Sequence, residues 1–300
     1  MSLKEKTRKT KEKNDGNKKK ISAIALGCGG AKGMAHLGVL KALEEEGITF
    51  DWYSGASIGS VIGALKAYGY TTDELKGEVL NIYLSRYLRY LRLYMDMGFI
   101  EDLLDTYLHG VEFSELQSPF YAWATDKEKM QGVLLEKGAV ARACTASSAV
   151  PPYFHSVEIE NRELIDGVYT NPVPADVLRT KGADFVLGVD LGEGVPSEPA
   201  NPFRSRNVIT RVLADTLDST VKLSVQPNAV SRGYEACDVM LKPPLEIYTP
   251  IDATKISLNE ICEIGYKTAK ENLPLILQKR AEAFGERIAE NTENEMSLDR

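Results

Sequence analysis

Residues 21–33, ISAIALGCGGAKG, join a short apolar run to a glycine-rich turn. The run over residues 21–26 is apolar on both faces, which is typical of a buried strand in a sheet covered on both sides. Residues 31–46 are expected to form a helix, because apolar residues recur at about every third position and Gly47 supplies a natural end. This strand–turn–helix unit predicts an α/β fold: a mostly parallel central sheet with helices on both faces, in three α/β/α layers.

The same alternation of apolar runs and helical patterns continues along the chain. Strands are predicted at residues 50–54, 120–125, 132–135, 157–159, 163–165, 185–189 and 238–241, and helices at 57–68, 139–149 and 257–290. Residues 71–118 are more polar and mainly helical in pattern, and we expect them to form a helical cap region. In sheets of this kind ligands bind beyond the carboxyl ends of the strands. Residues that follow strands are therefore the first candidates for chemistry.

The length and composition favour one main domain. The chain has 300 residues, of which 43% are hydrophobic, enough for a sizeable core. We expect this domain to span residues 21–290, followed by a flexible C-terminus over 291–300. The four cysteines form no C-x-x-C pair and lie at no zinc-finger spacing from a histidine. We therefore expect free thiols, no metal site and no cofactor.

The first twenty residues differ in charge from the rest of the chain. They hold nine Lys or Arg residues against three Asp or Glu, a net charge of +6, whereas the whole chain carries −7. They contain no apolar run, so they lack the core of a secretory signal. We expect residues 1–20 to be a disordered basic tail. Two interpretations stay open: a solubilising leader, or attraction to an anionic membrane surface.

The glycine-rich turn has two functional interpretations and one structural one. Glycines between a strand and a helix leave backbone N–H groups open at a helix N-terminus, which suits an anion. The turn, with Gly27, Lys32 and Gly33 as supporting residues, could form an oxyanion hole, a phosphate cradle or a packing turn. The dinucleotide pattern G-x-G-x-x-G fails because Lys32 stands at its last position, and the Walker pattern is absent.

A second motif, Gly55-Ala56-Ser57-Ile58-Gly59, also lies between a predicted strand and a predicted helix. This is the context of a G-x-S-x-G nucleophile elbow, in which small residues allow a tight turn that exposes the serine hydroxyl. The helix N-terminus there favours developing negative charge. We predict that Ser57 is a nucleophile, and the alternative is a packing turn.

A third candidate is Asp166-Gly167, which follows an apolar strand. Such an aspartate is usually a turn or cap residue, but the positions of the histidines favour a catalytic role here. The chain has only His36, His109 and His155, and all three precede Asp166. The Ser–acid–His order of α/β-hydrolases is therefore impossible if Asp166 is the acid. A serine without a histidine needs another base, and a carboxylate can serve.

Four blocks of the sequence, in order, resemble the patatin-like phospholipases. They are Gly29-Gly30-Ala31-Lys32-Gly33 with the His36–Leu40 run behind it, the Gly55–Gly59 elbow, Ala146-Ser147-Ser148-Ala149-Val150-Pro151, and Asp166-Gly167 with Asn171-Pro172-Val173-Pro174. All four blocks occur in the family's order, and the resemblance covers roughly residues 20–275. Four ordered blocks are far more specific than any one of them alone.

The resemblance implies a serine lipid acyl hydrolase that needs no metal. Carried over, Ser57 is the nucleophile, Asp166 is the base, and N–H groups of Gly29, Gly30 and Ala31 form the oxyanion hole. Two positions depart from the family pattern, since Cys28 and Val168 stand where glycine is common. The alternatives are a non-catalytic lipid- or protein-binding relative and, third, a nucleotide-binding protein. We expect a lipid ester substrate and no nucleic-acid partner.

Residues 81–99 combine apolar and tyrosine side chains at i, i+3, i+4 spacing with Arg86, Arg89 and Arg92 on another side. This pattern predicts an amphipathic basic helix. Two interpretations stay open: an ordinary helix packed on the core, or a cap over the site that contacts the membrane surface. No stretch approaches about 18 uninterrupted apolar residues, so we predict no transmembrane helix. We expect a cytoplasmic location, with peripheral contact at the inner membrane surface as a further hypothesis.

Overall fold

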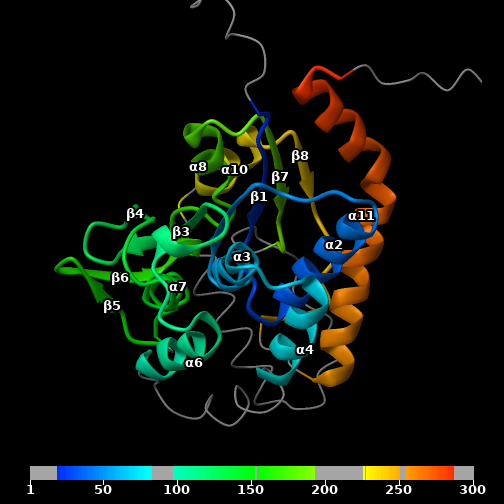
Figure 1. Cartoon of the computed structure of the whole chain (residues 1–300). Helices are drawn as coiled ribbons and strands as arrows, with labels where there is room; N and C mark the ends of the chain where they lie inside the picture. Colours follow the sequence, from blue (N-terminus) through cyan, green and yellow to red (C-terminus); the bar gives the residue numbers. More distant parts are fainter. Residues whose placement is uncertain are drawn as a thin grey trace, which may run out of the picture.

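The structure is a computed structural model that describes residues 19–82, 97–152, 154–192, 226, 228–250 and 254–286. Within these residues, eight strands form one sheet, in the order β5-β6-β3-β2-β1-β7-β8, and β4 also pairs with β3 (Figure 1). The strands are β1 (Ser22–Leu26), β2 (Trp52–Ala56), β3 (Phe120–Asp126), β4 (Gln131–Leu135), β5 (Val157–Ile159), β6 (Arg162–Asp166), β7 (Phe185–Val189) and β8 (Val239–Leu241).

The sheet is parallel in one part and antiparallel in the other. Strands β3, β2, β1, β7 and β8 pair in parallel, whereas β4 and β6 pair antiparallel to β3, and β5 antiparallel to β6. The parallel strands need crossover connections, and helices supply them. The carboxyl ends of β1 and β2 therefore lie at the same edge of the sheet, where ligands bind in folds of this kind.

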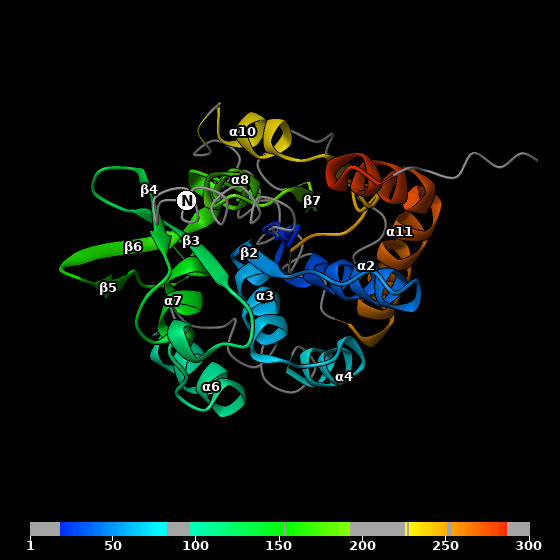
Figure 2. The ribbon, with the colours of Figure 1, turned by 45° about the horizontal axis from the view of Figure 1, so that its top comes forward.

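Helices cover both faces of the parallel part. Helices of the described residues are α2 (Met34–Glu45), α3 (Ile58–Tyr68), α4 (Thr72–Ile82), α6 (Gly98–Leu108), α7 (Val140–Ser147), α8 (Ala175–Lys181), α10 (Ala229–Ala236) and α11 (Lys255–Phe284), with short 3₁₀ turns η1 (Gly30–Gly33), η3 (Phe113–Glu115) and η4 (Gly167–Tyr169). Figure 2 shows α8 and α10 on one side of β1 and β7, and α2, α3 and α11 on the other.

The side chains of β1 belong alternately to two hydrophobic cores, one on each face of the sheet. Ile24 and Leu26 belong to the large core under α2, α3 and α11, whereas Ala23 and Ala25 pack in the second core with residues of α8. All four side chains are fully buried. Successive residues of a strand point to opposite faces, so the continuous apolar run predicted a strand buried on both sides, and the structure confirms it.

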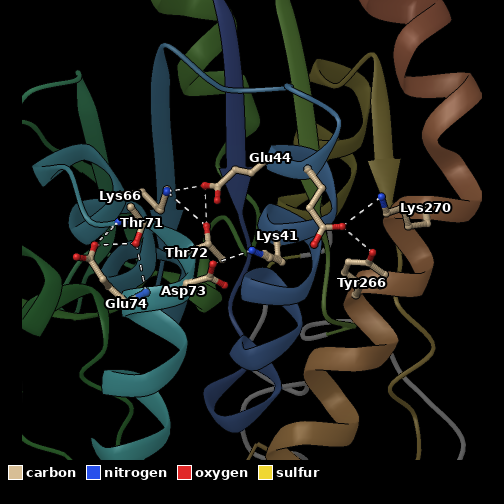
Figure 3. Close-up of polar contacts among 10 residues, drawn as sticks. Lys41, Glu44, Lys66, Thr71, Thr72, Asp73, Glu74, Tyr266 and Lys270 are labelled. Carbon is tan, nitrogen blue, oxygen red and sulfur yellow. Dashed lines mark hydrogen bonds and ion pairs between the residues drawn. The ribbon is translucent and has the colours of Figure 1, made fainter.

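Helix α2 lies against α11 at two glycines. A Cβ at Gly38 would overlap the Cys262 carbonyl oxygen, and a Cβ at Gly265 would overlap the Ala35 carbonyl oxygen. Polar contacts around α2 then join four helices, and Figure 3 shows them. Lys66 of α3 donates to Glu44 of α2, with 2.6 Å between Nζ and Oε1. Lys41 of α2 donates to Asp73 of α4 at 2.7 Å.

The predicted α/β architecture is confirmed, and differences are confined to element bounds and short helices. The helix expected over residues 31–46 begins as the 3₁₀ turn η1, and the strand expected at 50–54 lies at Trp52–Ala56. The helices α8 and α10 were not predicted. Residues 1–18, 83–96 and 287–300 lie outside the described residues. The basic tail, most of the amphipathic segment and the flexible C-terminus therefore stay predictions.

Among the described residues, no helix combines the length and apolar character needed to cross a bilayer. Within the same part of the chain, no three His, Cys, Asp or Glu side chains gather where they could hold a metal ion.

Candidate active site

The carboxyl ends of β2 and β6 meet head to head along one edge of β3. Strand β2 pairs in parallel with the first part of β3 and ends with Ala56 opposite Trp123. Strand β6 pairs antiparallel with the last part of β3 and ends with Asp166 opposite Ala124. Because β4 occupies the other edge of β3 over residues 122–126, β2 and β6 must share one edge. Ser57, which follows Ala56, and Asp166 therefore come together at neighbouring positions of β3.

Gly167 permits this close meeting. A Cβ at residue 167 would overlap the carbonyl oxygen of Trp123 and would lie 2.9 Å from the Cβ of Ala56. Real Cβ atoms do not approach carbon this closely. The glycine after Asp166 therefore lets the end of β6 lie against the residue that precedes Ser57. This is the physical reason for an Asp-Gly pair at this position.

Ser57 lies in a strained turn between β2 and α3. Its φ is 54° and its ψ is −131°, a backbone conformation that costs energy for a residue with a Cβ and marks functional sites. The two glycines of the motif make the turn possible, since a Cβ at Gly55 would overlap Gly59, and one at Gly59 would overlap the carbonyl of Leu26. Ser57 is partly exposed, whereas its neighbours Gly55 and Gly59 are buried. Ser57 therefore lies at the N-terminus of α3, in the strand–turn–helix context that the sequence predicted.

The glycine-rich turn engages several of its own amides with backbone carbonyls. Gly27 N–H donates to Val189 O at 3.0 Å and Cys28 N–H donates to Pro172 O at 3.0 Å. Two further amides are used in the same way: the Ala31 N–H donates to Pro250 O at 2.7 Å, and the Lys32 N–H donates to Gly29 O at 3.0 Å.

These bonds bear on both functional interpretations of the turn. A phosphate cradle needs several N–H groups directed at one ligand, and four amides of this turn point at carbonyl oxygens. The same bonds also concern the expected oxyanion hole, in which backbone N–H groups must donate to the substrate oxygen. Ala31, one of the three residues expected to donate, gives its N–H to Pro250 in this structure.

The side chain of His36 bonds to the backbone of the glycine-rich turn. Its side chain is fully buried, and Nε2 lies 2.8 Å from the carbonyl oxygen of Gly27. Burial is the larger cause that lowers the pKa of His36 to about 4, and the bond to Gly27 opposes that shift. The other two histidines are exposed: His109 ends α6 in the left-handed conformation, and His155 precedes β5.

Asp166 is completely buried, and its Oδ1 contacts both departures from the family pattern. It accepts the N–H of Val168 at 2.8 Å, and the thiol of Cys28 lies 3.8 Å from it. The contact with Val168 runs through the backbone, so any residue there could make it, whereas the contact with Cys28 depends on its side chain. Tyr169 lies nearby, and its pKa is raised first by burial and then by the charge of Asp166.

The end of α7 and the residues that follow it make contacts that the sequence motifs did not reveal. The Ser57 N–H donates to the Ser147 carbonyl at 3.1 Å and to the Ser147 Oγ at 3.0 Å. The Asp166 N–H donates to the Ala149 carbonyl at 2.9 Å. The block around Ser147 was noticed through its resemblance alone. A buried serine at the end of a helix carries no signal of its own for such a role.

Comparison with known proteins identifies the family. The sequence model described as Patatin-like phospholipase matches residues 24–179. The lysophospholipase NTE1 of Meyerozyma guilliermondii is 27% identical over an alignment of 278 positions, which covers 83% of this chain and 19% of that protein. The patatin-like phospholipase domain-containing protein ZK370.4 of Caenorhabditis elegans is 30% identical over an alignment of 302 positions, which covers 88% of this chain and 21% of that protein.

A bacterial relative and a solved structure extend the comparison. An uncharacterized NTE family protein of Mycobacterium tuberculosis is 31% identical over 202 residues, 65% of this chain and 56% of that protein. The chain thus spans about a fifth of the fungal and nematode relatives and just over half of the mycobacterial one. The crystal structure of VipD from Legionella pneumophila matches with a TM-score of 0.51 at 13% identity, over 86% of this chain and 67% of that one, which supports the fold.

Proposed function

The chain belongs to the patatin-like phospholipase family, and from this premise we propose that it is a serine hydrolase that cleaves acyl esters of lipids. Ser57 is the proposed nucleophile and Asp166 its base. The observation that carries the proposal is the meeting of β2 and β6 along one edge of β3, which brings these two residues together. The strained backbone of Ser57 supports the same assignment.

The proposed reaction has two half-reactions. Ser57 Oγ attacks the ester carbonyl carbon while Asp166 takes the serine proton, which gives a tetrahedral intermediate with a negatively charged oxygen. Collapse of this intermediate breaks the ester bond, and Asp166 returns the proton to the leaving alcohol. Asp166 then takes a proton from water as the water oxygen attacks the carbonyl carbon of the acyl-Ser57 ester. Collapse of the second tetrahedral intermediate releases the fatty acid, and Asp166 returns the proton to Ser57 Oγ.

The glycine-rich turn is the proposed oxyanion hole, with N–H groups of Gly29 and Gly30 as donors. The neighbouring amides of Gly27, Cys28, Ala31 and Lys32 are engaged with carbonyl oxygens. These bonds hold the turn in place before substrate arrives, and preorganised donors are what makes an oxyanion hole effective. His36 reinforces the turn through Gly27.

The substrate is proposed as a class. The name of the fungal relative states a lysophospholipase, so lysophospholipids are the first substrates to test. We also propose that residues 21–290 form the acyl hydrolase domain and that residues 71–118 belong to a cap. Of that cap the structure describes α4, α6 and η3, and Arg142 of α7 binds Glu101 of α6 with 2.9 Å between Nη1 and Oε2.

Hydrolysis of lysophospholipids and of p-nitrophenyl esters of graded chain length tests this proposal. We expect Ser57→Ala and Asp166→Asn each to lower kcat by several orders of magnitude, because one loses the nucleophile and the other its base. The double variant should be little slower than either single one, since residues that act as a unit are non-additive.

His155→Gln is the matched control, because it removes an exposed histidine and should keep its activity. Circular dichroism must show that all variants are folded. Ser57→Ala activity within about tenfold of wild type would refute the nucleophile. An inactive His155→Gln beside an active Asp166→Asn would make a histidine the base.

A further inference from the structure

The hydroxyl of Ser147 connects the nucleophile to the central strand β3. Ser147 is completely buried at the end of α7. Its Oγ donates to the carbonyl oxygen of Trp123 at 2.6 Å and accepts the N–H of Ser57 at 3.0 Å. One hydroxyl therefore uses both its donor and an acceptor position to join β3 to the elbow.

The same contact reaches the base. The Trp123 carbonyl that accepts from Ser147 is the oxygen that a Cβ at Gly167 would overlap, so the residue after Asp166 packs directly on it. Two residues beyond Ser147, the Ala149 carbonyl accepts the N–H of Asp166 at 2.9 Å. The segment over residues 147–149 thus contacts the backbones of both proposed catalytic residues.

A strained turn needs such contacts to persist. The φ of 54° and ψ of −131° at Ser57 cost free energy on their own, and residues keep strained conformations only where the surroundings over-determine them. The Ser57 N–H is held twice, by the carbonyl and by the hydroxyl of Ser147. Removal of the hydroxyl would leave one of these bonds and would also remove the bond from Ser147 to the Trp123 carbonyl.

We propose that Ser147 is a positioning residue of this site: its hydroxyl holds the Ser57 backbone at the orientation in which Oγ faces Asp166. The inference rests on the proposed function, since it assigns a role to Ser147 only if Ser57 is the nucleophile. Ser147 touches neither substrate nor the transferred proton and acts through the main chain of Ser57.

The test is the rate at which a fluorophosphonate probe labels Ser57, measured beside kcat and KM for a p-nitrophenyl ester. We expect Ser147→Ala to lower the labelling rate constant and kcat by roughly 10- to 100-fold, because a small displacement of a reacting group costs this much. KM should change little. Ser147→Cys, which keeps the side-chain volume but bonds weakly, should behave in the same way if Ser147→Ala fails to fold.

Ser148→Ala is the matched control, because the Ser148 hydroxyl bonds to the Cys144 carbonyl within α7 at 2.9 Å. It should label at the wild-type rate. A folded Ser147→Ala that labels within about threefold of wild type, even with a lower unfolding temperature, would show a merely structural serine and overturn the inference alone. If the probe does not label the wild-type protein, or labels wild type and Ser57→Ala at the same rate, the proposed function and this inference are both overturned.

Discussion

At the level of single residues, backbone contacts of the site tolerate changes that side-chain contacts do not. Val168 bonds Asp166 through its N–H, so valine in place of the family's glycine preserves the contact. Cys28 reaches the same carboxylate oxygen with its thiol, so this position alters the surroundings of the proposed base. Gly167, in contrast, has no room for any side chain.

The buried side chain of His36 should make the free energy of unfolding depend on pH. Its pKa is about 4 in the folded chain against an ordinary value of 6.5. Above pH 6.5 the imidazole is neutral in both states and contributes nothing. As the pH falls from 6.5 toward 4, the unfolded chain binds the proton first, so stability is lost. Over this range the loss amounts to roughly 3 kcal/mol of unfolding free energy.

Urea unfolding of wild type and His36→Gln at pH 7 and pH 4 measures this loss. Glutamine can donate to Gly27 as the imidazole does, but it does not titrate. The difference in unfolding free energy between the two proteins should therefore shift by roughly 3 kcal/mol in favour of His36→Gln at the lower pH. Parallel pH dependences would show that His36 is accessible to protons in the folded chain.

At the level of elements, helix packing depends on small residues at the crossing points. The contact of α2 with α11 occurs where Gly38 faces the backbone of Cys262 and where Gly265 faces that of Ala35. Figure 3 shows polar contacts beside this crossing, where Lys270 and Tyr266 of α11 both bond to Glu45, the last residue of α2. The two glycines allow the close approach of the helices, and the polar contacts join their exposed sides.

We predict that Gly38→Ala destabilises the fold by about 1–3 kcal/mol, because the new methyl group must push α2 away from α11. Gly77 of α4 is the matched control, since a Cβ there would have no atom within 4 Å. Gly77→Ala should stabilise the protein by about 0.5–1 kcal/mol through helix propensity. Thermal or urea unfolding of both variants measures the two changes in unfolding free energy. Equal changes for Gly38→Ala and Gly77→Ala would contradict the packing argument.

At the level of the whole molecule, α11 closes the large core. Leu258, Ile261 and Ile276 are completely buried along this helix, in the same cluster as residues of β1 and α2. Fully burying each such side chain contributes about 1.5–3 kcal/mol. The helix lies far from the site residues in sequence, yet the sheet that carries them depends on the core that it covers.

Two truncations test this dependence. A variant made of residues 19–286 keeps every helix and strand that the structure describes, so its unfolding temperature should equal that of the whole chain within a few degrees. A variant that ends at residue 254 lacks α11 and should show no cooperative unfolding. A cooperative transition in the shorter variant would mean that the core closes without this helix.

Most of the local structure and all of the proposed catalytic residues could be predicted from the amino-acid sequence. Apolar runs predicted the strands because side chains buried on both faces must be apolar throughout. Glycines marked the two turns after β1 and β2, and the order of the histidines excluded the usual triad with Asp166 as acid. The short helices α8 and α10 were not predicted, because seven or eight residues are too few to show a clear helical periodicity of apolar residues.

Only the tertiary structure decided how these parts meet. The head-to-head meeting of β2 and β6 along β3 follows from strand register, and this register joins segments that are 38 or more residues apart in the sequence. The bond from Ala31 to Pro250 and the contacts of Ser147 with Ser57 and Trp123 likewise join distant segments. Local periodicity reports whether a residue is buried and on which face. It carries no information about the partner, because partners are chosen by packing of the whole chain.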